Sequence, residues 1–298
     1  MNLKQTLADA VSRLEAQNVP SARMNAELLL MFTLGCDRAY LYAHPERELT
    51  GDERSRYEAA QAERARGVPA QYITGHQEFF GMDFIVTPAV LIPRPETEMI
   101  VETVLEKLQL KAIACGRGQA DAESFRQRGT GVRIADVGTG SGCIALALAS
   151  ELPSAQIYAT DISAPALEIA KINAARHQLD VRVHFLQADL LGDLEPGFDI
   201  VASNPPYVGE SEEDQVQLEV RRFEPRGAVF AGPTGTEVIQ RLIAAAHQRL
   251  RPDGWLVMEI SGTIAMEVHQ LLTAWNDVRI LPDLRGLQRI AIARRPAN

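Results

Sequence analysis

The stretch VRIADVGTGSGCIALALAS, Val132 to Ser150, decides the fold class of this chain. It begins with an apolar run typical of a buried strand, continues through three closely spaced glycines and ends in an apolar run of helical length. A strand, a glycine turn and a helix in this order form the first half of a βαβ unit. The stretch therefore predicts a parallel sheet with helices packed on it.

The same alternation of strand and helix continues through the second half of the chain. The expected strands are 132–137, 156–160, 181–186, 198–203 and 254–260, and the expected helices are 142–150, 164–177 and 236–250. This order predicts an α/β fold in which helices cover both faces of the sheet. Ligands of such sheets bind beyond the carboxyl ends of the strands, so we expect functional residues directly after the strands.

The first part of the chain is different, because its apolar residues recur at helical spacing. Helices are expected over 3–14 and 21–35, and Thr50 with Glu53 forms a plausible capping box for a third helix that ends near Gly67. These segments predict a small helical bundle. We take it as an N-terminal domain of residues 1–70.

Aromatic and β-branched runs broken by Gly75 and Gly81 follow the bundle. They predict a β-hairpin linker over residues 71–93, which leads into a catalytic domain of residues 94–298. Within that domain, the polar stretch 114–131 has no apolar period and is expected to be an exposed insertion.

Composition limits the possible partners. The formal net charge of -9 and the pI near 5.3 argue against a protein held to nucleic acid or to a membrane by its own field. The three cysteines lie far apart without metal-ligand spacing, which predicts neither a zinc site nor a disulfide framework and favours the cytoplasm. The N-terminus contains no long apolar run. We therefore expect a monomer without a metal, a membrane anchor or a direct nucleic-acid partner.

The turn after the first strand is the first candidate site. Its glycines allow a tight turn and a close approach of a ligand to the backbone. The residues of this turn are Gly138, Thr139, Gly140, Ser141 and Gly142. Taken alone, the spacing is also compatible with a plain connection between strand and helix.

Acidic residues follow the next two strands. Asp161 stands about 20 residues after the glycines, where a carboxylate can accept the hydroxyls of an adenosine ribose. The alternative is that Asp161 caps the helix that follows it. Asp189, with Leu190 after it, could border an adenine ring or simply close its strand.

The fourth strand ends in Asn204, Pro205, Pro206 and Tyr207. Because proline has no backbone N–H, this turn offers hydrogen-bond acceptors, chiefly the Asn204 side-chain oxygen and the Pro205 carbonyl. An NH₂ group whose lone pair is delocalised is a poor nucleophile and needs acceptors around its hydrogens. Tyr207 can lie against the flat face of such a group. The turn therefore suits a planar substrate that carries an NH₂ group, although a purely structural turn is the alternative.

Together these strand ends resemble those of the class I S-adenosylmethionine-dependent methyltransferases that methylate amino groups on sp² centres. The glycine spacing is G-x-G-x-G, whereas an NAD site has G-x-G-x-x-G. The resemblance implies a Rossmann-like mixed sheet of seven strands, with S-adenosylmethionine as the cofactor.

Longer segments point to one family within this class. The segments are GVPAQYITGHQEFFGMDFIV (67–86), LIPRPETE (91–98), RFEPRGAVFAG (222–232) and DLRGLQRIAIARR (283–295). They closely resemble the PrmC/HemK family, the release-factor glutamine methyltransferases, and the resemblance covers nearly the whole chain. Related ribosomal-protein glutamine methyltransferases usually depart from the Arg-Pro-Glu-Thr-Glu that this chain keeps at 94–98.

The resemblance implies an activity and a substrate. The glycine turn and Asp161 would hold S-adenosylmethionine, and residues 204–207 would hold a glutamine side chain. That glutamine belongs to the Gly-Gly-Gln motif of class-I peptide-chain release factors and is methylated on its N5 amide nitrogen. The chain departs from the family in two places: Leu190 stands where some members have tryptophan, and the stretch 114–131 is longer than a compact linker.

Several alternatives remain open at this point. Arg94, Glu96 and Glu98 either contact substrate or only begin a helix that has Pro95 in its first turn. An adenine-N6 methyltransferase and a non-catalytic S-adenosylmethionine-binding adaptor are the two competing functions. Because a pocket for one amide cannot select one glutamine among many, we expect residues 1–70 to recognise the partner protein, the alternative being that they only stabilise the catalytic domain.

Overall fold

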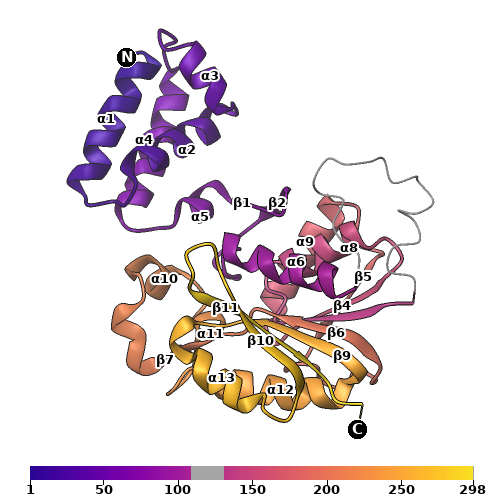
Figure 1. Cartoon of the computed structure of the whole chain (residues 1–298). Coiled ribbons are helices and arrows are strands. Elements are labelled where there is room, and N and C mark those ends of the chain that lie inside the picture. The colour runs from indigo at the N-terminus through magenta and orange to yellow at the C-terminus, as the bar shows by residue number, and fades with distance from the viewer. Residues whose placement is uncertain (109–130, 298) are drawn as a thin grey trace. The chain divides into compact units, whose positions relative to one another are not determined.

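A computed structural model describes residues 1–108 and 131–297 of the chain. The polar stretch predicted as an insertion lies outside the described residues, apart from Gly131. The chain divides into two compact units (Figure 1). Unit 1 comprises Met1–His76 and Gln217–Phe223, and unit 2 comprises Gln77–Val216 and Glu224–Asn298.

Unit 1 is built from helices, as its apolar spacing predicted. They are α1 (Leu3–Ala16), α2 (Ala22–Leu34), α3 (Arg38–Ala43), α4 (Gly51–Ala65), α5 (Ala70–Thr74) and α10 (Leu218–Phe223). A core of leucine and alanine side chains closes around Tyr57, whose hydroxyl donates to the Ala26 carbonyl at 2.9 Å. The short helix α10 belongs to this unit although it is distant in sequence, and Glu219 on it pairs with Arg64 at 2.9 Å.

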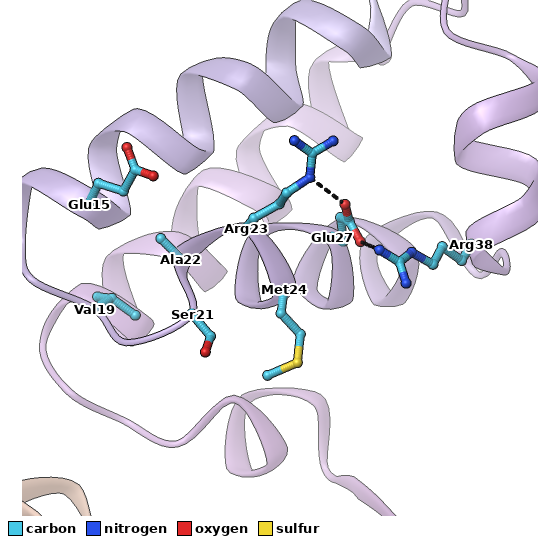
Figure 2. Close-up of a pocket in the computed structure, with 8 residues that line it drawn as sticks. All are labelled: Glu15, Val19, Ser21, Ala22, Arg23, Met24, Glu27 and Arg38. Carbon is cyan, nitrogen blue, oxygen red and sulfur yellow. Dashed lines mark hydrogen bonds and ion pairs between the residues drawn. The ribbon is translucent and has the colours of Figure 1, made fainter.

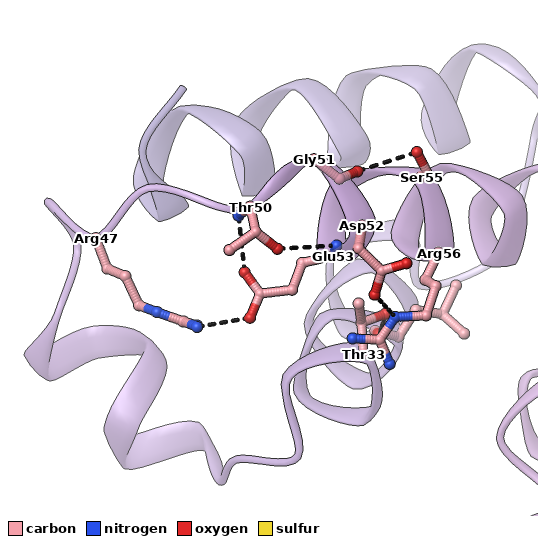
Figure 3. Close-up of polar contacts among 9 residues, drawn as sticks. Thr33, Arg47, Thr50, Gly51, Asp52, Glu53, Ser55 and Arg56 are labelled. Atoms are coloured by element: carbon pink, nitrogen blue, oxygen red, sulfur yellow. Dashed lines mark hydrogen bonds and ion pairs between the residues drawn. The ribbon is translucent and has the colours of Figure 1, made fainter.

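The predicted capping box at the start of α4 is confirmed (Figure 3). The Thr50 hydroxyl accepts from the Glu53 N–H at 3.2 Å, and Glu53 Oε2 accepts from the Thr50 N–H at 2.9 Å. The second Glu53 oxygen accepts from Arg47 at 2.7 Å. Two otherwise unpaired backbone donors are satisfied, which fixes the start of the helix.

The boundaries of α2 follow the prediction, but Ser21 acts differently from an ordinary cap. Ser21 has φ of 50° and its side chain makes no capping hydrogen bond. At the other end, Gly35 adopts the left-handed conformation with φ of 62°, and its N–H donates to the Phe32 carbonyl. Glycine adopts that conformation at low cost, which is why the helix ends there.

Unit 2 contains a mixed sheet of seven strands, which confirms the predicted fold class. The order across the sheet is β10-β11-β9-β6-β3-β4-β5. β9, β6, β3, β4 and β5 run parallel, whereas β11 is antiparallel to β9 and to β10. The strands are β3 (Arg133–Val137), β4 (Gln156–Asp161), β5 (Val183–Gln187), β6 (Phe198–Ser203), β9 (Leu250–Glu259), β10 (Asn276–Pro282) and β11 (Gln288–Arg294).

Helices cover both faces of this sheet, and each face has its own apolar core (Figure 1). One face carries α6 (Glu98–Lys107), α8 (Cys143–Glu151) and α9 (Ala164–Arg176), and the other carries α12 (Glu237–Arg249) and α13 (Ala265–Leu271). Side chains alternate between the faces, so that Ile200 lies in the first core and Val201 in the second. Such a sheet places its ligand sites at the strand ends.

Short elements complete unit 2. They are β2 (Met82–Ile85), η1 (Pro95–Thr97), β7 (Val208–Gly209), η2 (Glu210–Gln215), α11 (Arg226–Val229), β8 (Phe230–Gly232) and η3 (Gly262–Ile264). β2 pairs with β1 (His76–Phe79) in the predicted hairpin. Phe79 and Phe84 of this hairpin are almost fully buried and belong to the core beside α6 and α8. The hairpin is therefore part of the packing of unit 2.

The described residues contain neither a helix that could span a membrane nor a cluster of metal-binding side chains. No helix within 1–108 or 131–297 is both long and apolar enough to cross a membrane. Over the same ranges, no group of three or more His, Cys, Asp or Glu side chains is placed to hold a metal ion.

Candidate active site at the strand ends

The register of the parallel strands brings the candidate residues to one edge of the sheet. Val137 pairs with Thr160 on one side and with Ser203 on the other, and Ser203 pairs with Met258. The residues that follow these four are Gly138, Asp161, Asn204 and Glu259. β3 and β6 are adjacent in the sheet but not consecutive in the chain, and this is the switch point at which such sheets bind ligands.

The glycine turn is held by the neighbouring strand and leaves its outer side open. The N–H groups of Gly138 and Thr139 both donate to the Thr160 carbonyl, at 2.8 and 2.9 Å. Gly140 has φ of 55°, and a Cβ at this position would meet none of the described atoms within 4 Å. At Gly142, by contrast, a Cβ would lie 3.2 Å from the Ala170 side chain, so this glycine serves helix packing.

Asp161 braces the glycine turn. Its Oδ2 accepts from the Gly140 N–H and its Oδ1 from the Ser163 N–H, each at 2.9 Å. The Ser163 hydroxyl accepts from the Ala166 N–H, so Ser163 caps α9 and the alternative role of Asp161 as that cap is wrong. Each Asp161 oxygen has one backbone donor and keeps lone pairs for further donors.

Asp136 lies beside the glycine turn and was not among the predicted site residues. It is fully buried, and its Oδ2 accepts from the Thr139 hydroxyl at 2.6 Å and from the Ala145 N–H at 3.2 Å. Its Oδ1 is buried and has no hydrogen-bond partner among the described residues. Burial raises the pKa of Asp136 to about 7, against the opposing effect of these hydrogen bonds. The sequence could have identified Asp136, because a charged residue is rarely found inside an apolar strand unless it has a specific role.

The third strand end is more open than the other two. Asp189 forms an ion pair with Arg241, and both side chains are about half exposed. Leu190 has φ of 54°, and its carbonyl accepts from the buried Thr160 hydroxyl at 2.7 Å. Ile162, which follows Asp161, is 70% exposed and offers a further apolar surface at this edge.

The turn after β6 is held in place by the segments that follow it, β7, β8 and the loop after β8. Pro205 is buried, and Pro206 and Tyr207 are partly exposed. Directly after the turn, Val208 of β7 pairs in parallel with Phe230 of β8. A Cβ at Gly235 would come within 2.7 Å of the Tyr207 carbonyl, so the loop after β8 packs tightly against the turn. The backbone of the segment that follows therefore braces the turn.

Glu259 and Thr97 are hydrogen-bonded to the turn after β6, and neither was predicted. Tyr207 donates its hydroxyl to Glu259 Oε1 at 3.0 Å, and Thr97 donates its hydroxyl to Glu259 Oε2 at 2.6 Å. Asn204 Nδ2 donates to the Thr97 oxygen at 3.1 Å. Thr97 and Glu259 are each only 2% exposed. Glu259 ends a buried strand, and this position alone could have identified it.

Two of the three charged residues of the segment 94–98 have structural partners. Arg94 pairs with Glu224, whose Oε2 also accepts from the Ile92 N–H at 3.1 Å. Glu98 Oε1 accepts from the Phe80 N–H at 2.8 Å in the hairpin. These contacts hold the segment in place, and its contact with Asn204 is made by Thr97.

A hollow of about 560 Å³ lies on unit 1 (Figure 2). Arg23 and Arg38 extend toward the carboxylate of Glu27 in this view, at 3.1 and 2.8 Å. Glu27 is 4% exposed and also accepts from the Tyr42 hydroxyl. Both carboxylate oxygens have partners within unit 1, so the arrangement stabilises the bundle. The hollow is lined by none of the predicted site residues.

Comparisons with known proteins agree with this fold. Residues 5–75 match the family model of the PrmC N-terminal domain, and residues 122–222 match that of the methyltransferase small domain. The catalytic domain of hMettl16, solved in complex with MAT2A 3′UTR hairpin 6, has a TM-score of 0.54 and 17% identity, and the alignment covers 80% of this chain and 82% of that one. Fold and strand-end site define a class I methyltransferase, whose cofactor is S-adenosylmethionine.

Full-length relatives give the family. The release factor glutamine methyltransferase of Koribacter versatilis is 50% identical over all of both chains. That of Chlorobaculum tepidum is 42% identical over 96% of this chain and 94% of its own. The chain belongs to the release factor glutamine methyltransferase family.

Proposed function

We propose that this protein transfers a methyl group from S-adenosylmethionine to the N5 amide nitrogen of the glutamine in the Gly-Gly-Gln motif of class-I release factors. The reaction takes place in the cytoplasm, where translation is terminated. The observation that carries the proposal is the turn from Asn204 to Tyr207, which lies at the switch point of the sheet and offers acceptors to an NH₂ group.

The residues around β3 and β4 suit the cofactor. S-adenosylmethionine supplies an electrophilic methyl group on a sulfonium. The Oδ1 of Asp136, which has no partner within the described part of the chain, is an acceptor next to the glycine turn, where an ammonium or amide donor would satisfy it. Asp161 has lone pairs left for ribose hydroxyls, and the open side of Gly140 lets a ligand approach the backbone. Asp189, Leu190 and the exposed Ile162 then border the purine.

The turn from Asn204 to Tyr207, the acceptor turn, holds and orients the substrate amide. Asn204 Oδ1 and the Pro205 carbonyl accept the two amide hydrogens, and no prolyl N–H competes for the nitrogen. Tyr207 bounds the flat face of the amide. Orienting a weak nucleophile in line with the methyl group is the main contribution that such a site can make to the rate. All these groups are neutral, so the turn itself supplies no general base.

Recognition of the protein substrate belongs to the helical domain in this proposal. Residues 1–70 recognise the release factor, the hairpin segment 71–93 joins them to residues 94–298, and the latter catalyse the reaction. One amide pocket cannot distinguish one glutamine from all others, so a second surface is needed to select the substrate. The match of residues 5–75 to a domain model of this family supports such a division.

A labelled methyl donor tests the function. The purified protein is incubated with labelled S-adenosylmethionine and one of three partners: a class-I release factor, the same factor with its Gly-Gly-Gln glutamine replaced by glutamate, or duplex DNA. We expect label only in the unaltered release factor. Label in DNA would favour an adenine-N6 methyltransferase. Cofactor binding without transfer to any partner would favour a non-catalytic adaptor.

A further inference from the structure

Three hydrogen bonds connect the acceptor turn to a buried carboxylate. Asn204 Nδ2 contacts Thr97 Oγ1, Thr97 Oγ1 contacts Glu259 Oε2, and Glu259 Oε1 contacts the Tyr207 hydroxyl. The four residues come from η1, the turn after β6 and the end of β9. Because Ser203 and Met258 are paired in the sheet, Asn204 and Glu259 stand at the same level of neighbouring strands.

The carboxylate of Glu259 determines which group donates in each of these three hydrogen bonds. In the structure both hydroxyls donate to Glu259, which is the only pattern open to an ionised carboxylate because it can only accept. A hydroxyl has one hydrogen, and once Thr97 has given it to Glu259, only lone pairs face Asn204. The group of Asn204 that lies against Thr97 must then be its NH₂. The side-chain oxygen is consequently turned away from Thr97.

We propose that Glu259 is a positioning residue that acts through Thr97 to fix the amide orientation of Asn204, so that Asn204 Oδ1 faces the substrate glutamine. The inference rests on the proposed function and adds a residue to it. If the Asn204 amide were reversed, its NH₂ would point at the NH₂ of the substrate, and two donors would face each other. An asparagine side chain by itself has no preference between these two orientations, so its hydrogen-bond partners must determine the orientation.

Burial is the largest effect on Glu259 and raises its pKa. The hydrogen bonds from Thr97 and Tyr207 and the positive charge of Arg289 act in the opposite direction and support the carboxylate form that this role requires. Arg289 stands on β11, next to Ile290, which pairs with Glu259. The same carboxylate holds the Tyr207 hydroxyl, so one buried group fixes two of the side chains that contact the substrate.

Three substitutions test the proposal in the full chain. Thr97→Val removes the hydroxyl but keeps the shape, Thr97→Ser keeps the hydroxyl, and Glu259→Gln replaces one acceptor oxygen by a donor. We expect Thr97→Val and Glu259→Gln to lower turnover on release factor by about tenfold or more, and Thr97→Ser to stay within about threefold of the unaltered enzyme. The matched control is Thr103→Val, a buried threonine of α6 outside this network.

Asn204→Asp separates orientation from simple acceptance. Aspartate keeps an oxygen for the substrate but cannot donate to Thr97, so we expect it to be about as inactive as Asn204→Ala. An active Asn204→Asp variant would overturn the proposal. So would near-normal turnover of both Thr97→Val and Glu259→Gln. A Thr97→Ser variant as poor as Thr97→Val would also overturn it, because a hydroxyl at this position would then be irrelevant.

A measurement without substrate keeps this inference separate from the proposed function. In protein with isotope-labelled asparagine, hydrogen exchange of the Asn204 side-chain NH₂ is followed by nuclear magnetic resonance. We expect slow exchange in the unaltered chain and in Thr97→Ser, and exchange about tenfold faster in Thr97→Val. Equal exchange in all three would overturn the orientation proposal whatever the substrate is. If exchange behaves as expected but no release factor is methylated, the proposed function fails and the hydrogen-bond relay remains.

Discussion

At the residue scale, Asp161 has one structural role and one proposed binding role. Its two oxygens accept from Gly140 and Ser163, so the carboxylate shapes the glycine turn before any ligand is bound. In the proposed site, the same oxygens accept ribose hydroxyls. Charge-assisted hydrogen bonds are stronger than neutral ones, so the loss of this carboxylate should be felt directly in cofactor affinity.

We therefore expect Asp161→Ala to weaken the binding of S-adenosylmethionine by about 1.5–3 kcal/mol. Isothermal titration calorimetry on folded protein measures it. The matched control is Asp180→Ala, an exposed aspartate beyond the other end of α9, which should leave the affinity unchanged. Equal affinities of the two variants would remove Asp161 from the site.

Asp136 should make stability depend on pH. Its pKa is raised to about 7 in the folded protein because the carboxyl is buried, and it returns to its ordinary value near 3.8 in the unfolded chain. Between these two values the folded state binds more protons than the unfolded state. Its contribution to the free energy of unfolding is therefore fully favourable below the lower value and is lost as the pH rises toward the higher one.

Asp136→Asn should remove that dependence. Urea unfolding of the two proteins is compared from about pH 4 to about pH 8. As the pH rises, we expect the difference in free energy of unfolding to shift in favour of the variant, by at most about 1.4 kcal/mol per pH unit. The difference should level off above about pH 7. Both proteins share every other titrating group, so their difference isolates this carboxyl. A difference that does not vary with pH would show that Asp136 is not a buried titrating group.

At the scale of elements, most of the sheet and of the helices covering it could be predicted from the spacing of apolar residues and from the glycines and prolines that interrupt it. The strand ending at Val137 and the acceptor turn after Ser203 lie where alternating patterns placed them. The β10–β11 pair was implied only by the family resemblance, because β10 is largely exposed and has no apolar run. The short helix α3 was missed for a similar reason, since six residues give too little period.

The candidate site was predictable in part, and the reason is physical. Glycines, prolines and an aspartate after a strand are unusual in sequence, so they stand out from their neighbours. Thr97 and Glu259 are ordinary residues whose role arises from a contact between positions far apart in the chain. The register of β6 against β9 brings Glu259 to the level of Asn204, and the position of η1 brings Thr97 to both; local patterns contain neither.

Asn173 ties three elements together. It is fully buried on α9, its Nδ2 donates to the carbonyls of Ile85 on β2 and Ser141 in the glycine turn, and its Oδ1 accepts from the Ile85 N–H at 2.7 Å. Removing a buried side chain with three hydrogen bonds leaves backbone groups without partners. The hairpin, the helix and the cofactor turn should therefore loosen together.

We expect Asn173→Ala to lower the free energy of unfolding by about 2–4 kcal/mol in a chemical denaturation experiment. Lys171→Ala, which breaks only the exposed pair with Glu168 on the same helix, should change it by less than about 0.5 kcal/mol. If the two variants were equally stable, the hydrogen bonds of Asn173 would not couple these elements.

At the scale of the whole molecule, the chain consists of two units, and the helical one includes α10 from the second half of the sequence. The hairpin residues Phe79 and Phe84 belong to the core of the catalytic unit, so a shortened chain must retain them. It should begin near Gln77. In such a chain α10 loses Arg64, the partner of Glu219.

A chain that begins at Gln77 and is shown to be folded should bind S-adenosylmethionine within about threefold of full-length protein. We expect its activity on intact release factor to fall by at least about tenfold, because the proposed docking surface is gone. A short Gly-Gly-Gln peptide is the control substrate and should be methylated equally by both chains. Full activity on the intact factor would show that residues 1–70 do not recognise it.

In the proposed function, the turn at Asn204 directs one methyl group to one glutamine nitrogen. Tandem mass spectrometry of a release factor, after incubation with S-adenosylmethionine and either the unaltered enzyme or Asn204→Ala, tests this directly. We expect a single added methyl on the side-chain nitrogen of the Gly-Gly-Gln glutamine, formed at least about tenfold more slowly by the variant, whose melting temperature should be nearly unchanged. A methyl group on any other residue, or equal rates for the two enzymes, would contradict the account.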